Sequence, residues 1–211
     1  MKRQNHFIER IVGKPLGKLP GGRIPDNPGN CSYPHKHIIL DEDSLKAAVC
    51  HDYVCAEYKN SYRNGDNFIG RDCLPVDCDN DHSENPEDWI TPEDVLQAFP
   101  GVTFAVHYSR FDNRVKNGKP ARPKFHVLFP IDYVTDAAFY RKTKKLLNSI
   151  FPCFDTKALD AARFFFGTTA AEVALYPGRM NLTEYLNEAP VFLIVLNMRM
   201  IQRMKIRWCY I

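Results

Sequence analysis

The stretch KFHVLFPI, residues 124–131, predicts a β-strand whose two faces differ in chemistry. Side chains alternate between the faces of a strand, so Phe125 and Val127 share one face while Lys124 and His126 share the other. An apolar face packs into a core, and a lysine beside a histidine suits the lining of a cleft. An edge strand with one solvated face would show the same pattern, so the stretch alone leaves both interpretations open.

The sequence on either side alternates strands and helices joined by short links. VTFAVHYS (102–109) is rich in β-branched and aromatic residues and predicts a strand. TPEDVLQAF predicts a helix that begins after a capping Thr91, with proline at its first position. Longer helices are expected over residues 43–58 and 135–151, and further strands at residues 73–78 and in the segments RFFFGT and AEVALY. This order favours an α+β fold with a partly antiparallel sheet.

The two ends of the chain differ from its middle. Residues 13–37 are rich in glycine and proline without periodicity, so we expect an extended N-terminal arm over residues 1–42. The main domain is expected over residues 43–188. Residues 189–211 form an atypical tail, in which VFLIVL precedes a stretch rich in methionine and basic residues. The tail is open to two interpretations, a genuine strand and basic helix or the out-of-frame end of a truncated reading frame.

Composition and charge narrow the class of protein. The chain has 211 residues, of which 45% are hydrophobic, so it can bury a sizeable core and is not globally disordered. Its seven cysteines include no CxxC pair, which favours reduced thiols. The N-terminus lacks the sustained apolar stretch of a signal peptide, and the longest apolar run is too short to span a bilayer. A cytoplasmic protein without a membrane partner is therefore expected.

Charge is distributed unevenly along the chain. The formal net charge is only +3, yet residues 77–94 hold eight acids and no Lys or Arg. Residues 110–145 hold ten Lys and Arg against three Asp. An acidic cluster beside a basic tract suits a metal-dependent enzyme that acts on phosphates. Two solvated surfaces of opposite sign would give the same composition.

The acidic cluster begins with VDCDND, which follows an apolar run. On a strand, Asp77 and Asp79 share one face and Val76 shares the other with Cys78. Two carboxylates this close repel each other unless a proton or a cation lies between them. Their hard oxygen atoms suit Mg²⁺ or Mn²⁺, although a plain turn would also explain the pattern. Asp81 is expected at the end of the strand.

A third acidic and basic segment, FDTKALDAARFFFGT, covers residues 154–168. It contains Asp155, Asp160 and Arg163 ahead of three consecutive phenylalanines. In isolation, Asp155 would cap a turn and the phenylalanines would belong to the core.

Taken in order, the DxD pair, the basic-x-His strand and the later aspartate before ARFFFGT resemble the catalytic motifs of the archaeo-eukaryotic primase superfamily. The resemblance is to its primase–polymerase (prim-pol) branch, found in phages, plasmids and mobile elements, and it covers roughly residues 45–175. It implies a small α/β unit packed with an RRM-like sheet, with the active site in the cleft between them.

The resemblance implies roles for the motif residues. Asp77, Asp79 and Asp155 would be catalytic carboxylates that bind two Mg²⁺ or Mn²⁺ ions. His126 would contact the triphosphate of the incoming nucleotide, with Lys124 close by. In nucleotidyl transfer of this kind, one cation activates the 3′-hydroxyl and the other stabilises the leaving pyrophosphate.

Several basic residues complete the expected site. Arg163 would lie near nucleotide phosphates or the template, and Arg122 flanks the basic-x-His strand in a position suited to phosphate binding. Arg63, Arg110 and Asp160 are weaker candidates. A zinc site is not expected, because the Cys and His residues near the N-terminus match no standard zinc spacing.

The expected partners are nucleoside triphosphates, a single-stranded DNA template and a replicative helicase acting in trans. The template groove would be formed by the loop 110–124 and the helix face 141–145. Two alternatives stay open. The chain could be a truncated, non-catalytic module that binds single-stranded DNA in a replication protein, or a different metal enzyme, namely a nuclease or a DxD transferase.

Overall fold

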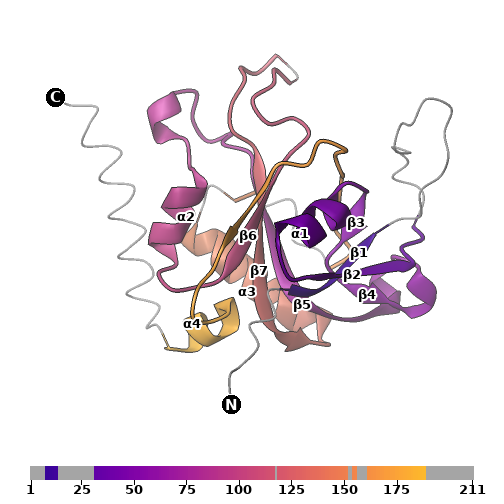
Figure 1. Ribbon diagram of the computed structural model, residues 1–211. Helices are drawn as coiled ribbons and strands as arrows, with labels where there is room; N and C mark the ends of the chain where they lie inside the picture. Colours follow the sequence, from indigo (N-terminus) through magenta and orange to yellow (C-terminus); the bar gives the residue numbers. More distant parts are fainter. Residues whose placement is uncertain (1–7, 14–30, 117, 152–153, 156–160, 189–211) are drawn as a thin grey trace, which may run out of the picture.

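A computed structural model describes residues 8–13, 31–116, 118–151, 154–155 and 161–188 of the chain (Figure 1). The strands are β1 (Ile8–Gly13), β2 (His35–Ile39), β3 (Tyr53–Val54), β4 (Glu57–Tyr58), β5 (Phe68–Cys78), β6 (Phe104–Tyr108), β7 (Phe125–Val134), β8 (Phe164–Phe165) and β9 (Val173–Tyr176). The α-helices are α1 (Glu42–Val49), α2 (Pro92–Ala98), α3 (Ala137–Ile150) and α4 (Leu182–Glu188).

The strands form two sheets. The larger sheet has the order β4-β5-β7-β6-β9 and the smaller one the order β2-β1-β3-β8. All strand pairs in the two sheets are antiparallel. The combination of antiparallel sheets with helices confirms the predicted α+β class.

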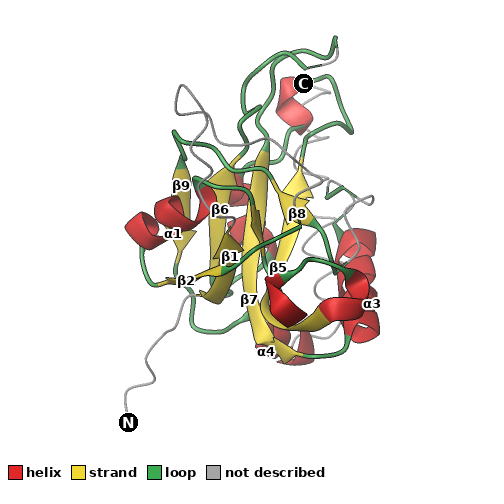
Figure 2. Ribbon diagram, turned by 90° about the vertical axis from the view of Figure 1, so that its right-hand side faces the viewer, coloured by secondary structure: helices red, strands yellow, loops and turns green. Residues whose placement is uncertain are grey.

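Each face of the larger sheet is covered by different elements (Figure 2). On one face, Val76 of β5 and Val127 of β7 share a core with residues of α2, α3 and α4. On the other face, Leu128 of β7 packs with residues of α1, β3 and β8. The strand alternation predicted for KFHVLFPI is therefore confirmed: the face of His126 and Leu128 is turned toward α1 and the smaller sheet.

The helix expected over residues 43–58 is shorter than predicted. It begins after Asp41, whose side chain caps the N–H of Ser44, and it ends at Val49. The chain then forms β3 and β4 instead of continuing the helix. The reason is tertiary: buried Tyr53 and Val54 pair with both β1 and β8, and aromatic and β-branched residues suit such a position.

The other predicted elements occur close to their expected positions. Thr91 caps the start of α2, as its sequence predicts, and it also forms a capping box with Asp94. The strands expected at residues 102–109 and 124–131 correspond to β6 and β7, and β5 is longer than the expected 73–78. Helix α4 was not predicted.

Of the apolar residues Phe139, Leu146 and Leu147, which the sequence places on the buried face of helix α3, only Leu147 is buried. Phe139 is 54% exposed and Leu146 is 42% exposed, whereas Tyr140, Lys144 and Leu147 are buried. Lys144 therefore lies in the interior, so it cannot belong to the exposed basic groove expected along residues 141–145.

Near the two ends of the chain, the structure describes only some of the residues. Within the expected arm 1–42, the described residues include β1 and β2, and the tail 189–211 lies outside the described residues. None of the helices in the described ranges is long and apolar enough to cross a membrane.

Candidate active site

Three polar residues lie side by side across the centre of the larger sheet. Asp77 of β5 is paired with His126 of β7, and His126 is paired in turn with His107 of β6. All three occupy the face turned toward the smaller sheet, because the residues that flank them, Val76, Val127 and Val106, belong to the core on the opposite face. The alternation of two strands thus brings a carboxylate and two imidazoles into one row.

Both carboxylate oxygens of Asp77 have a partner. Oδ1 accepts a hydrogen bond from Nδ1 of His126, and Oδ2 lies 3.5 Å from Nη2 of Arg163. A carboxylate can only accept, so Nδ1 of His126 carries the proton, and in the neutral imidazole Nε2 is left as an acceptor. The His126–Asp77 contact thereby fixes the tautomer of a side chain that also lines the pocket described below.

The charge of Asp77 is stabilised by its surroundings. The side chain is only 8% exposed, and this burial acts to raise its pKa. His126, Lys144 and Arg163 outweigh the burial, so the pKa of Asp77 lies below its usual value. Asp77 is therefore an ionised, largely buried carboxylate at neutral pH.

Asp155 lies next to Asp77 although the two are far apart in sequence. Phe154 forms an antiparallel bridge with Cys78, and the N–H of Asp155 donates to the backbone oxygen of Asp77 at 2.8 Å. Phe154 shares the core with Cys78, so alternation turns the side chain of Asp155 to the face of Asp77. Side chains opposite each other in such a pair lie about 5 Å apart at Cβ. The pairing brings the backbones of two of the three predicted acids together.

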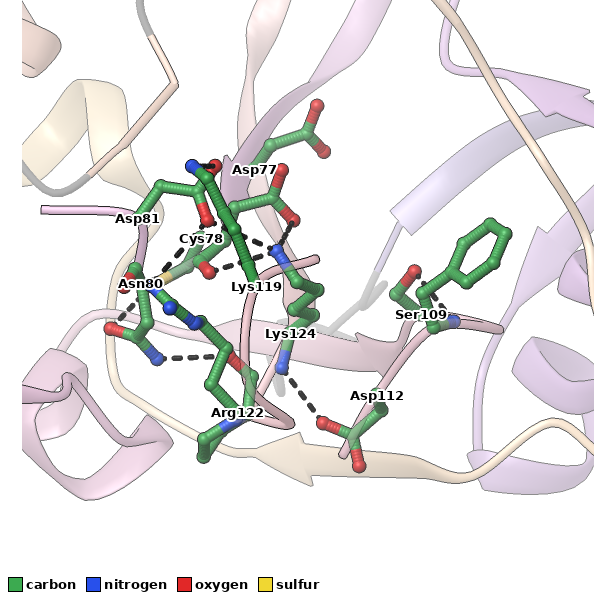
Figure 3. Close-up of polar contacts among 12 residues, drawn as sticks. Asp77, Cys78, Asn80, Asp81, Ser109, Asp112, Lys119, Arg122 and Lys124 are labelled. Carbon is green, nitrogen blue, oxygen red and sulfur yellow. Dashed lines mark hydrogen bonds and ion pairs between the residues drawn. The ribbon is translucent and has the colours of Figure 1, made fainter. Parts of the chain in front are cut away.

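Asp79 follows the end of β5 and is held by Lys124. The ammonium of Lys124 lies 3.3 Å from Oδ1 of Asp79 and donates to its backbone oxygen at 3.1 Å. It also reaches Oδ1 of Asp81 at 3.4 Å (Figure 3). Lys124 is 5% exposed, so its charge is neutralised by these acids and it does not face open solvent. We call the segment after β5 that holds Asp79 and Asp81 the acidic turn. Lys124 supports this turn and does not line the pocket.

Arg122 is also directed toward the acidic turn. It is 1% exposed and donates through Nη1 to the backbone oxygens of Asn80 at 2.8 Å and Ser83 at 3.2 Å (Figure 3). Asp81 lies 3.6 Å from the same nitrogen, and it is also paired with Lys119 at 2.9 Å. The basic loop after β6 is thus fastened to the acidic turn after β5.

The contacts of Arg122 predict a structural effect on substitution. Replacing Arg122 with Ala leaves the buried carbonyl of Asn80 without its charged donor, so we expect the free energy of unfolding to fall by about 2 kcal/mol. Denaturant unfolding followed by circular dichroism measures this. Arg114→Ala, at an exposed arginine of the same loop, is the matched control and should be nearly neutral. An Arg122→Ala protein as stable as the control would contradict the structural role.

A pocket of about 360 Å³ opens in front of Asp77 and His126. Its lining consists of Asp77, Asp79, Ser109, Arg110, Phe111, Lys116, His126, Arg163, Phe164, Phe165 and Phe166. Residues of the larger sheet, of β8 in the smaller sheet and of the loop after β6 thus share one cavity. The lining combines two acids, three cationic side chains and four phenylalanines with His126 and Ser109.

The backbone around β8 is fixed by close packing. The N–H of Gly167 donates to Oδ1 of Asp52 at 3.1 Å, and a Cβ at this position would lie 2.2 Å from the backbone carbon of His51. Only glycine permits this approach, which explains the glycine that follows RFFF. Phe165 is consequently buried, while Phe164 and Phe166 are half-exposed and reach the pocket.

The predicted residues fall into three groups. Asp77, Asp79, His126, Arg163 and Arg110 share the pocket, and Asp155 adjoins it through its pairing with Asp77. The remaining candidates lie elsewhere: Lys124 and Arg122 hold the acidic turn, Arg63 donates to the backbone oxygen of Ala162 at 2.9 Å, and Asp160 lies outside the described residues.

The sequence did not predict that Phe164 and Phe166 line the pocket, or that Lys144 and His107 are buried. The phenylalanines of RFFF were interpreted as core, and the alternation across a two-residue strand was the signal that Phe164 and Phe166 share a face opposite Phe165. Nothing in the sequence indicates the burial of Lys144 or His107, because a lysine in an amphipathic helix and a histidine in a strand are both common.

The carboxylates suit a divalent cation in type. Asp77, Asp79 and Asp155 offer carboxylate oxygens, which is the ligand chemistry of Mg²⁺ and Mn²⁺. Within the described ranges, however, no three His, Cys, Asp or Glu side chains are arranged to hold a metal ion. Asp79 would have to exchange the ammonium of Lys124 for a metal before it could take part.

No protein-family model matches the chain, and no curated protein matches it. Among solved structures, the chain is similar to the AEP domain (PP-N190) of the primase-polymerase (PrimPol) of cyanophage S-2L. The two chains share 10% sequence identity, and the similarity covers 86% of this chain and 88% of that chain with a TM-score of 0.46. A likeness this distant transfers no function, so the residues of the pocket themselves must support one.

Proposed function

We propose that the chain is the catalytic domain of a DNA-dependent primase–polymerase of a phage or mobile element. It would join nucleoside triphosphates by metal-dependent nucleotidyl transfer on a single-stranded DNA template. The observation that carries this proposal is the pairing of Asp77 with Asp155 beside Asp79, at a pocket that also holds His126 and Arg163. Carboxylates that can bind metal and cations that can bind phosphate thus share one cavity.

The residues of the pocket would divide the work of binding. Arg163 lines the cavity beside Asp77 and would supply a fixed positive charge, which a triphosphate needs. His126 lines the same cavity, and its Nε2 would interact with a phosphate oxygen when the imidazole is protonated. Asp77 holds that imidazole in place through Nδ1.

A bound Mg²⁺ or Mn²⁺ pair would activate the 3′-hydroxyl and neutralise charge on the leaving pyrophosphate. Asp77, Asp79 and Asp155 are the residues proposed to hold it. The ionised state of Asp77 at neutral pH favours metal binding, because only a carboxylate, and not a carboxylic acid, is a good ligand.

The test is a labelled primer annealed to a longer template, incubated with the protein, Mn²⁺ and nucleoside triphosphates. A strand lengthened only on the template supports the proposal. A shortened strand would indicate a nuclease. An intact strand, with nucleotide-dependent transfer to a sugar acceptor instead, would indicate a DxD transferase.

A second candidate function is a non-catalytic module that binds single-stranded DNA within a replication complex. The observation in its favour is that these acids already have protein partners: His126 and Arg163 contact Asp77, and Lys124 contacts Asp79. An intact strand in the extension assay, together with retained binding to the unpaired template, would select this function. A replicative helicase acting in trans is a proposed partner in either case.

The role of His126 predicts a binding defect on substitution. His126→Ala removes one charged hydrogen bond to the triphosphate, so we expect the KM for nucleotide to rise about tenfold with a smaller change in kcat. Steady-state incorporation over a range of nucleotide concentrations measures both constants. His82→Ala, at an exposed histidine of the acidic turn, is the control. An unchanged KM for nucleotide in His126→Ala would rule out this role.

A further inference from the structure

One wall of the pocket is built from alternating cations and aromatic rings. The ammonium of Lys116 lies 4.5 Å from the centroid of Phe111, and the guanidinium of Arg110 lies 5.3 Å from the same ring. Arg110 is closer still to Phe166, at 4.0 Å. Each cation thus lies within the range of a cation–π contact, which holds flexible side chains in place.

The set extends past Phe166 to Phe164, which also lines the pocket, and then to Arg63, which lies outside the lining. Phe166 meets Phe164 edge to face, with ring centroids 4.9 Å apart and planes at 80°. The guanidinium of Arg63 then lies 4.8 Å from the centroid of Phe164, and Arg63 is itself held by the backbone oxygen of Ala162. We call this set the aromatic–cation ladder: Lys116, Phe111, Arg110, Phe166, Phe164 and Arg63.

The chemistry of the ladder points to one class of ligand. A single strand of nucleic acid alternates anionic phosphates with flat, unpaired bases, which stack on aromatic rings and on guanidinium planes. A duplex would not offer those faces, because its bases are already stacked and paired. Phe164, Phe166 and Arg110 are half-exposed, so their outer faces can be reached.

We infer that the aromatic–cation ladder is a base-stacking platform that guides a single DNA strand toward the pocket. This inference rests on the proposed function, since it assigns the template strand to a surface of the proposed active site. It moves the strand away from the helix face 141–145 and onto β8 and the loop after β6. The binding it describes is independent of sequence, because every base has a π-face.

The experiment measures fluorescence anisotropy of a labelled oligothymidylate of about 12 nucleotides, a length matched to sites of this kind. Neither metal nor nucleotide is present. Phe166→Leu keeps an apolar side chain and removes the ring, so we expect affinity to fall about tenfold. The slope of affinity against salt concentration should stay unchanged, because no charge is lost.

Arg110→Lys is the second variant, since it keeps the charge and removes the planar group. We expect about a threefold to tenfold loss of affinity, again with an unchanged salt slope. Arg114→Ala removes a charge from the same loop outside the ladder and should weaken binding less than about twofold. If Arg114→Ala weakens binding as much as Arg110→Lys, charge alone explains the affinity and the inference is wrong.

An abasic strand of the same length provides the sharpest comparison. It carries the same phosphates without bases, so wild-type protein should bind it as weakly as Phe166→Leu binds the thymidine strand. Phe166→Leu should cause no further loss on the abasic strand. Equal wild-type affinity for both strands would overturn the platform. Base-dependent binding by a protein that never extends a primer would instead keep the platform and refute the polymerase.

Discussion

Replacing Asp77 with Asn is expected to lower nucleotide incorporation about 1,000-fold or more, the largest effect on activity that we anticipate. Asparagine has nearly the same shape and can still accept a hydrogen bond from Nδ1 of His126. The side-by-side arrangement of residues 77, 126 and 107 across the larger sheet can therefore persist. What is lost is the negative charge that Arg163 and His126 surround and that a divalent cation would require. Single-turnover incorporation with Mn²⁺ measures the effect.

The matched control is Glu84→Gln, which removes one charge from the same acidic segment at an exposed position. It should leave incorporation within about twofold of the wild-type rate, because exposed charges contribute little locally. Affinity for the labelled oligothymidylate shows that Asp77→Asn is folded, since the ladder does not include Asp77. A folded Asp77→Asn protein that incorporates nucleotide at the wild-type rate would refute the catalytic assignment of this carboxylate.

The sequence predicted the local parts of the site and could not predict how they meet. Alternation along KFHVLFPI and VDCDND was enough to put His126 on one face of its strand and Asp77 with Asp79 on one face of theirs. Neither pattern contains the register between the two strands. A shift of one residue would turn His126 away from Asp77, and only the packing of the whole sheet sets that register.

Long-range pairing also explains why the helix expected over residues 43–58 is shorter in the structure. Val54 fits a helical spacing in sequence, but its strand, β3, pairs with β1 and β8, neither of which adjoins it in the chain. The bond from the N–H of Asp155 to Asp77 is equally remote. Local propensity cannot register such contacts, because tertiary burial overrides it.

Lys144 is the clearest case of a residue whose environment only the fold reveals. It occupies the buried face of α3, is 1% exposed, and its ammonium has no hydrogen-bond partner among the described residues. Burial, against the attraction of Asp77, lowers the pKa of Lys144 from 10.5 to about 8. Asp77 benefits from this positive charge, since Lys144 is one of the groups that lower its pKa.

The shift makes Lys144 a source of instability at neutral pH. Its pKa is lower in the folded state than in the unfolded state, so the charged form opposes folding. The cost is fully present below about pH 8 and disappears as pH rises through about 8 toward 10.5. From the difference between these two pKa values, the cost at pH 7 is roughly 3 kcal/mol.

Lys144→Met is therefore expected to stabilise the protein by roughly 3 kcal/mol at pH 7 and by about half of that at pH 9.5. Denaturant unfolding at the two pH values measures the gain, and Lys142→Met, at an exposed position of α3, should change stability by less than about 0.5 kcal/mol. A stability gain that does not depend on pH would show that packing, and not charge, is responsible.

The same substitution separates stability from function. Without Lys144, the pKa of Asp77 rises, so the acidic limb of the pH–rate profile for incorporation should move to higher pH even though the fold is more stable. A purely structural lysine would leave that limb in place. A Lys144→Met protein with greater stability and an unchanged acidic limb would show that the buried ammonium does not tune Asp77. A shifted limb would mean that the fold tolerates an unpaired charge because the carboxylate needs it.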